Sequence, residues 1–288
     1  MACKRSGVQF PLAPRNPFAL GVDLGVGTSF SAVSATQNSG DFTLRGLRAL
    51  VTGGGSGIGK AIADGMKLAG ATVVVCDVND STNPDYVCDV ANSKDVTSMF
   101  SRISTDLGGL DILVNNVGVP GPTARVDEMD PEAYDECVRV NLGGTFRCAH
   151  AAVPMLIESK GSMVNISTSA GIYGYPLRSP YVAAKWGIIG LTKSWAMELG
   201  EFGVRVNAIC PGSVSGPRMD GVIARESAAT GIPAEELRRG YANQVSLRTF
   251  VEASDIAASV VFLCSPAARF ITGQVLPVDG NIETMRAD

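Results

Sequence analysis

The chain has 288 residues, of which 45% are hydrophobic and 18% are charged, with a net charge of -4 and a pI near 5.2. This length fits one large α/β domain or two small ones. The acidic balance argues against a surface for nucleic acid or anionic membrane. No apolar run reaches the ~18 residues that a membrane-spanning helix needs.

The seven cysteines contain no C-x-x-C pair, and several stand in apolar, strand-like runs. This pattern predicts free, buried thiols in a reducing compartment, and we expect a cytoplasmic protein. The one histidine, His150, rules out a His-rich metal site and stands in an Ala-rich helical run. No metal is expected.

Residues 1–41 differ from the rest of the chain, because three prolines and three glycines interrupt their apolar stretches. We expect a leader that is disordered or loosely attached. Lys4 and Arg5 before apolar residues leave an organelle or export signal as an alternative, although no clear cleavage site follows. A translation start further along the chain is the third explanation. The folded domain is expected at residues 42–288.

From Leu44 onward, short β-branched runs alternate with longer helical ones. Strands are predicted at residues 48–51, 72–76, 111–114, 162–166, 204–209 and 274–278. Helices are predicted at about 60–69 and at 254–263, the second with Ser254 as its cap and Asp255 in its first turn. Continuous apolar strands separated by helices indicate a single doubly wound, Rossmann-type α/β domain, with a parallel sheet and helices on both faces.

The first predicted strand runs into a glycine-rich loop, TGGGSGIG, at residues 52–59. Glycines allow a diphosphate to approach the backbone, and the N-terminus of the following helix offers free N–H groups. The expected diphosphate contacts are Gly53, Ser56, Gly57, Ile58 and Gly59.

Asp77 ends the second predicted strand, 18 residues after Gly59. A carboxylate there accepts hydrogen bonds from the adenosine ribose and repels a 2′-phosphate. No arginine or lysine stands within the glycine-rich loop or directly after Asp77. The sequence therefore favours NAD over NADP as the cofactor.

Tyr181 and Lys185 stand four residues apart in a predicted helix, so both side chains share one face. A nearby ammonium is expected to lower the pKa of the phenol from its usual value of about 10. The pair is then suited to proton transfer at an alcohol or carbonyl oxygen.

From about Phe42 to Glu283, the chain resembles the classical short-chain dehydrogenases/reductases. The resemblance is carried by T-G-x-x-x-G-x-G at residues 52–59, Asn115-Asn116-Val117-Gly118, Y-x-x-x-K at residues 181–185 and Pro211-Gly212. It implies further cofactor contacts at Asp89, Val90, Asn116, Gly118, Tyr181, Lys185, Pro211, Gly212 and Val214.

The resemblance also implies a catalytic asparagine at Asn141 and a catalytic hydroxyl 13 residues before Tyr181, which is Thr168 where the family usually has serine. Ser167 and Ser169 stay open as alternatives. A second departure is Gly216, which stands where the family often has a threonine that binds the nicotinamide amide.

Residues of about 214–244 correspond to the family's mobile substrate lid. Arg218 in this segment, and Arg178 before Tyr181, either bind an acidic or polyol substrate or are solvated. The last helix and strand resemble subunit-packing elements, so a homo-oligomer, a tetramer or dimer, is expected.

The implied reaction is the NAD-linked interconversion of a secondary alcohol and a ketone. Two alternatives remain: an epimerase or lyase that retains NAD on the same fold, and a non-catalytic dinucleotide-binding protein. The expected partner is a small-molecule alcohol or ketone, with no nucleic acid and no membrane.

Overall fold

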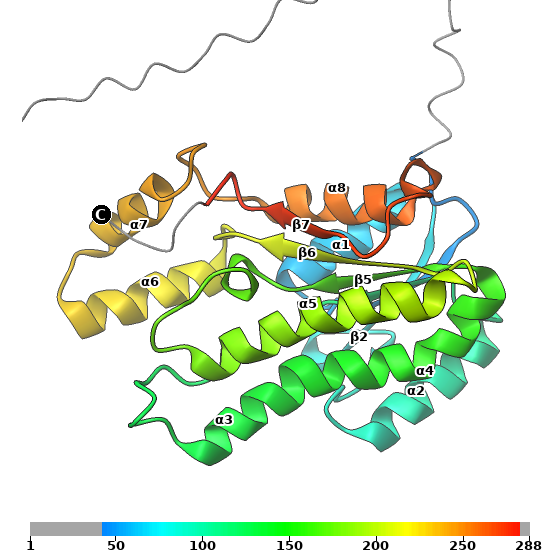
Figure 1. Cartoon of the computed structure of the whole chain (residues 1–288), viewed down its shortest axis with the longest axis horizontal. Coiled ribbons are helices and arrows are strands. Elements are labelled where there is room, and N and C mark those ends of the chain that lie inside the picture. Colours follow the sequence, from blue (N-terminus) through cyan, green and yellow to red (C-terminus); the bar gives the residue numbers. More distant parts are fainter. Residues whose placement is uncertain (1–41, 283–288) are drawn as a thin grey trace, which may run out of the picture. The chain divides into compact units, whose positions relative to one another are not determined.

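The computed structural model describes residues 42–282 (Figure 1). Their seven strands form one parallel sheet in the order β3-β2-β1-β4-β5-β6-β7. The strands are β1 (Arg48–Thr52), β2 (Thr72–Asp77), β3 (Tyr86–Val87), β4 (Ile112–Asn115), β5 (Ser162–Ile166), β6 (Arg205–Pro211) and β7 (Val275–Val278). The predicted leader, residues 1–41, lies outside the described residues.

The α-helices follow the strands in the pattern of a doubly wound fold, which confirms the predicted class. They are α1 (Gly57–Leu68), α2 (Ser93–Leu107), α3 (Pro131–Val138), α4 (Gly144–Ser159), α5 (Ser179–Gly200), α6 (Pro217–Thr230), α7 (Ala234–Asn243) and α8 (Ala253–Cys264). Shorter turns are η2 (Asp80–Thr82), η4 (Ser169–Gly171) and η5 (Pro266–Ala268), and the π-helical segment η3 (Arg139–Gly143) joins α3 to α4.

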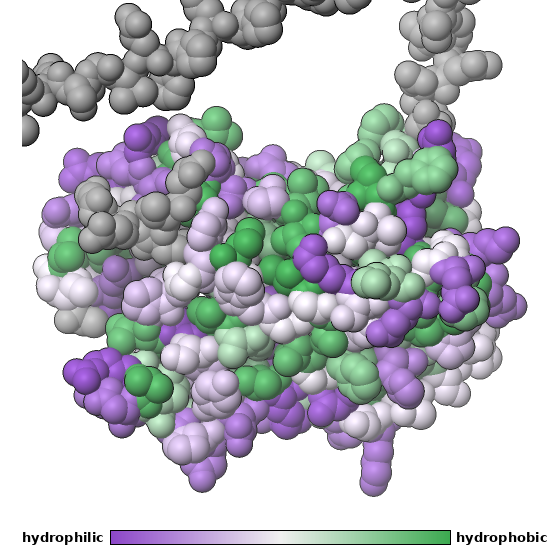
Figure 2. All heavy atoms as spheres, in the orientation of Figure 1, coloured by the Kyte–Doolittle hydropathy of each residue, from purple (hydrophilic) through white to green (hydrophobic). Residues whose placement is uncertain are grey.

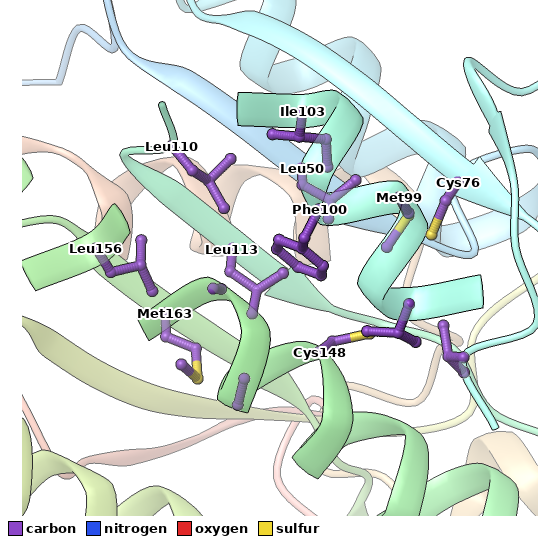
Figure 3. Packing of buried hydrophobic residues seen from close by; sticks show 14 of the residues in the cluster. Leu50, Cys76, Met99, Phe100, Ile103, Leu110, Leu113, Cys148, Leu156 and Met163 are labelled. Carbon is purple, nitrogen blue, oxygen red and sulfur yellow. The ribbon is translucent and has the colours of Figure 1, made fainter. Parts of the chain in front are cut away.

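The sheet is covered on both faces, because successive side chains of a strand point to opposite sides. In β1, Leu50 belongs to a core with α2, α4 and α5, whereas Ala49 and Val51 belong to a second core with α1 and α8. Figure 3 shows the first core, where Phe100 of α2 lies beside Leu50 and Leu113 of two neighbouring strands. Both cores anchor the strands whose carboxyl ends carry the site.

The structure differs from the predicted elements at several ends. β3 was missed because it has two residues, too few for a hydrophobic pattern. α1 begins at Gly57 rather than at about Lys60, inside the glycine-rich loop. The N-cap of α8 is Glu252, which forms a capping box with Asp255, and not Ser254. Asp255 does stand in the first turn, as predicted.

Within residues 42–282, no helix is both long and apolar enough to cross a membrane. All six cysteines in this part of the chain are free and buried, as their apolar surroundings in the sequence predicted. They are Cys76, Cys88, Cys137, Cys148, Cys210 and Cys264.

Candidate active site

The candidate site lies at the carboxyl ends of the strands, where the parallel sheet places the loops after β1, β2, β4, β5 and β6 at one edge. In a doubly wound sheet this edge is the usual place for a ligand. The site residues predicted from the sequence stand in or next to these loops, on α5 or in η3.

The glycine-rich loop packs so closely against the protein that Gly54, Gly55 and Gly59 have no room for a side chain. A β-carbon at Gly54 would stand 2.5 Å from Val75 Cγ1, and one at Gly55 would stand 2.9 Å from Asp77 Oδ2. Gly53 and Gly57 have φ values of 63° and 53°, a left-handed conformation that favours glycine. The Ser56 side chain, at the N-cap of α1, makes no capping hydrogen bond, so it leaves the first N–H groups of the helix without a side-chain acceptor.

Asp77 is the last residue of β2, and its carboxylate lies against this loop. Its Oδ2 accepts a hydrogen bond from the Gly55 N–H at 3.3 Å, and its Oδ1 accepts one from the Asn79 N–H at 3.0 Å. These bonds hold the carboxylate beside the loop, where the predicted ribose contact requires it.

Two neighbouring residues were expected around the adenine. The Asp89 carboxylate accepts a hydrogen bond from the Ala91 N–H at 2.9 Å. Val90 is buried, and a β-carbon at Gly144 of α4 would stand 2.7 Å from its Cγ2. Val90 therefore packs closely against α4.

Asn116 follows β4 and ties that strand to the glycine-rich loop. Its Nδ2 donates to the carbonyl oxygens of Thr52 at 3.0 Å and Gly53 at 3.2 Å. Its N–H donates to the Thr52 hydroxyl at 3.0 Å. The sequence assigned Asn116 to the cofactor, and in the structure its amide nitrogen positions the loop.

Asn141 stands in the π-helical segment η3 and is fully buried. Its Nδ2 donates to the Cys137 carbonyl at 2.9 Å and to the Val119 carbonyl at 3.1 Å, whereas its Oδ1 has no hydrogen-bond partner. A buried acceptor without a partner costs about 1–3 kcal/mol. This oxygen is therefore a candidate for binding a water molecule or a ligand.

Gly118 leaves the space through which Asn141 and Lys185 face each other. A β-carbon at Gly118 would stand 2.8 Å from Asn141 Oδ1 and 3.3 Å from Lys185 Nζ. The structure thus brings an unpartnered acceptor and an ammonium to one small volume.

Lys185 lies one turn after Tyr181 on α5 and is 3% exposed. Its Nζ donates to the Ile166 carbonyl at 3.0 Å and lies 5.8 Å from the centre of the Tyr181 ring. Burial, and secondly the positive charge of Arg218, lower the pKa of Lys185 to about 8.

The pKa of Tyr181 corrects one expectation. The sequence predicted that Lys185 lowers it, but burial raises the pKa of the phenol above its ordinary value. The opposing influences are the charges of Arg218 and Arg178 and the hydrogen bond from Thr168. Desolvation disfavours the phenolate more than these groups stabilise it.

Of the three hydroxyls left open by the sequence, only that of Thr168 acts on the Tyr181 phenol, whose pKa it lowers, and its Oγ1 lies 3.4 Å from the Pro211 carbonyl oxygen. The Ser167 hydroxyl is buried and donates to the Lys185 carbonyl at 2.9 Å. The buried Ser169 hydroxyl donates to the Pro211 carbonyl at 3.1 Å and lies 3.3 Å from Asp279 Oδ2. Both serines therefore support the backbone of the site.

The turn after β6 borders the candidate site. The Gly212 N–H donates to the Val278 carbonyl at 3.1 Å. Val214 forms an isolated bridge with Val251, and Gly216, the N-cap of α6, has a φ of 128°. Pro211, Gly212 and Val214 thus reach the site as a fixed backbone turn.

Sequence reasoning missed two residues of this region. Cys137 is buried and contacts Asn141 with its Sγ, 3.4 Å from Nδ2. Tyr175 lies under the guanidinium of Arg178. The helical spacing of Cys137 and Asn141 was a signal for the first, but no sequence pattern indicates the second.

Comparison with known proteins agrees with the fold. The family model described as enoyl-(acyl carrier protein) reductase, within the short-chain dehydrogenases/reductases, matches residues 53–281. A relative from Sphingobium indicum, 2,5-dichloro-2,5-cyclohexadiene-1,4-diol dehydrogenase, is 34% identical over 252 residues, which cover 83% of this chain and 97% of that protein.

Solved structures give the same picture. NAD+-bound xylitol dehydrogenase superposes with a TM-score of 0.77 at 27% identity, covering 82% of this chain and 99% of its own. A gluconate 5-dehydrogenase from Burkholderia cenocepacia, in complex with NADP and tartrate, gives 0.76 at 28% identity, covering 84% and 97%. These neighbours hold either of the two nicotinamide dinucleotides.

Proposed function

Because the chain belongs to the classical short-chain dehydrogenase/reductase family and is an oxidoreductase by its relatives, we propose that it interconverts a secondary alcohol and a ketone with NAD. The observation that carries the proposal is the grouping of Tyr181, Thr168, Lys185 and Asn141 at the edge of the sheet that also holds the glycine-rich loop.

The residues fit a nicotinamide dinucleotide. The Ser56 side chain does not cap α1, so the N–H groups at the start of this helix are available to a diphosphate. Asp77, held beside that loop, would accept hydrogen bonds from the adenosine ribose. The residues that follow it, 78–85, contain two aspartates and two asparagines but no arginine or lysine, which supports NAD rather than NADP. When bound, NAD supplies the hydride acceptor at the edge of the site.

Side chains of the protein would transfer the proton of the substrate hydroxyl. Tyr181 takes the proton of the substrate hydroxyl as the carbonyl forms, and Thr168 donates a hydrogen bond to the same substrate oxygen. Lys185 places a positive charge beside the developing phenolate and binds the nicotinamide ribose. Asn141 Oδ1, which has no partner in the protein, would hold a water that carries the proton to solvent.

The raised pKa of Tyr181 predicts how the rates of oxidation and reduction depend on pH. Oxidation of the alcohol needs the phenolate, so its rate should increase as the pH rises toward that pKa. Reduction of the ketone needs the phenol and should be favoured at lower pH.

The test is the variant Tyr181→Phe, assayed by NADH absorbance against a panel of secondary alcohols with NAD and NADP side by side. We expect turnover to fall by at least about 1000-fold, with NAD affinity nearly unchanged because the ring is kept. The matched control is Tyr134→Phe, which removes a phenolic hydroxyl from α3. Retained activity in the Tyr181 variant would refute the assignment.

We also propose a homo-oligomer that packs through α4 and α5. α5 is apolar around much of its circumference, yet Trp186 is 48% and Met197 85% exposed on it, and Phe146 of α4 is 51% exposed. In Figure 2, apolar residues, in green, are interspersed with polar ones over the face on which α4 and α5 lie in Figure 1. Sedimentation of the purified chain tests the oligomer.

The free buried thiols support a reducing compartment such as the cytoplasm.

A further inference from the structure

Arg178 lies at the reacting phenol and is only partly engaged by the protein. Its guanidinium carbon lies 5.3 Å from the centre of the Tyr181 ring and 5.6 Å from that of Tyr175. One amino group, Nη2, donates to the Pro120 carbonyl at 2.6 Å, and the buried Nε has no hydrogen-bond partner. Two aromatic rings and one carbonyl thus fix the plane of this cation and leave donors of its fork unused.

Arg218 supplies a second positive charge, which lowers the pKa of Lys185 and opposes the rise in the pKa of Tyr181. It is the second residue of α6 and follows the turn in which the Ser215 N–H donates to the Val251 carbonyl at 2.8 Å. Its charge acts on both Tyr181 and Lys185. Arg218 makes no hydrogen bond to another described residue and is exposed.

Neither arginine has a carboxylate partner among residues 42–282. Four other arginines do: Arg48, Arg125, Arg139 and Arg238. The acids of α6 are engaged elsewhere, because Asp220 pairs with Arg238 and Glu226 accepts a hydrogen bond from Tyr241 at 2.6 Å. Arg178 and Lys185 lie 5.3 and 5.8 Å from the centre of the Tyr181 ring. Within residues 42–282 neither these two cations nor Arg218 forms a salt bridge with an acid, so an anion that enters the site would be attracted by all three.

We infer that the substrate of the proposed reaction carries an anionic group, a carboxylate or a phosphate, and that Arg178 and Arg218 bind this group while Tyr181 contacts the reacting hydroxyl. The inference rests on the proposed function and narrows its substrate class. Arg178 is the principal anchor, since a fixed guanidinium plane matches the two oxygens of such a group. Arg218 adds its charge from the first turn of α6. Neutral secondary alcohols lack this contact and are poorer substrates.

The first experiment compares matched pairs by NADH formation. Each hydroxy acid, such as 2- or 3-hydroxybutyrate and gluconate, is paired with its methyl ester or with the corresponding polyol, and glycerol 1-phosphate is paired with glycerol. We expect kcat/KM to be about 10- to 100-fold higher for the anionic member of the pair that the site accepts. Preference within the carboxylate or the phosphate pairs tells which anion is used.

The second experiment uses variants on the accepted pair. Arg178→Met and Arg218→Met should raise KM for the anionic substrate about 10-fold or more while leaving KM for its neutral partner nearly unchanged. A change in kcat that comes from the pKa of Tyr181 should be the same for both members of the pair. Arg178→Lys should recover part of the loss through its charge. The control is Arg269→Met, because Arg269 also stacks on an aromatic ring, Phe270, at 5.3 Å but belongs to the loop before β7.

The outcomes separate the two ideas. Turnover of neutral alcohols equal to that of their anionic partners would overturn the inference and leave the proposed function standing. Equal loss for both members of a pair in Arg178→Met would assign the arginine to the packing of Tyr175 and Tyr181 and would also overturn it. No turnover of any alcohol by the unmodified protein would refute the proposed function, and the inference would fall with it. Malonate, which has no hydroxyl, should inhibit competitively against the alcohol.

Discussion

The ammonium of Lys185 destabilises the folded protein, and its replacement by methionine should show this. Its pKa is lowered to about 8 from the ordinary 10.5 because the side chain is buried. At about 1.4 kcal/mol per pKa unit, the charged form costs the folded state about 3 kcal/mol at pH 7. Lys185→Met removes this cost but leaves the Ile166 carbonyl, 3.0 Å away in the native protein, without its donor, at about 1–3 kcal/mol.

The sign follows from proton binding. Between pH 8 and 10.5 the unfolded chain holds the lysine proton more strongly than the folded chain, so raising the pH stabilises the folded state. The unfavourable contribution of Lys185 should therefore shrink by about 1.4 kcal/mol between pH 7 and pH 9. The variant carries no such contribution, so its stability advantage over the native protein should shrink by the same amount.

The measurement is urea unfolding of both proteins at pH 7 and pH 9, with the difference between them taken at each pH. Taking this difference cancels the contributions of Cys148 and Cys264, whose raised pKa values act in the opposite direction and do not depend on Lys185. Lys193→Met, an exposed lysine of the same helix, controls for loss of a lysine from α5. A stability difference that stays constant or widens between the two pH values would refute the reasoning. The Lys185 variant should also lose turnover.

Three further predictions concern the rest of the site. Gly59→Ala should weaken NAD binding by at least about 10-fold and lower the unfolding temperature, because the new β-carbon would clash with the loop. Gly190→Ala is the control, since Gly190 has open space around it on α5, and it should stabilise the protein by up to about 1 kcal/mol. Calorimetry measures both binding and unfolding. Thr168→Val should lower kcat by about 100-fold and Ser169→Ala by much less, so similar kcat values would contradict the assignment of the hydroxyl. Asp77→Ala should weaken NAD about 10-fold and NADP less in titrations, and an unchanged ratio would contradict the ribose contact.

The fold was predictable because its strands are continuous apolar runs, which in a sheet covered on both faces leave little ambiguity. Examples are β1 and β4, in which Leu50 and Leu113 are fully buried. β3 was not predictable, because its two residues pair with β2 through backbone bonds that no side-chain pattern records.

The site divides in the same way. The spacing of Tyr181 and Lys185 was enough to place both on α5. The choice of Thr168 by counting residues stays a prediction. The pKa of the phenol was not predictable, since it depends on burial and on Arg218, which is distant in the chain. The stacking of Arg178 between two tyrosines likewise depends on the path of the loop before α5.

The π-helical segment around Asn141 sets a limit on how this part of the chain can change. An α-helix turns by 100° per residue, so removing one residue from Arg139–Gly143 would let α3 and α4 join as one regular helix. That helix would have better backbone bonds, but one of its halves would be rotated by more than a quarter of a turn relative to the sheet. The amide of Asn141 would then face away from Gly118. A deletion in this segment would therefore disturb the site more than a substitution that keeps its length, because the deletion turns Asn141 away from Gly118.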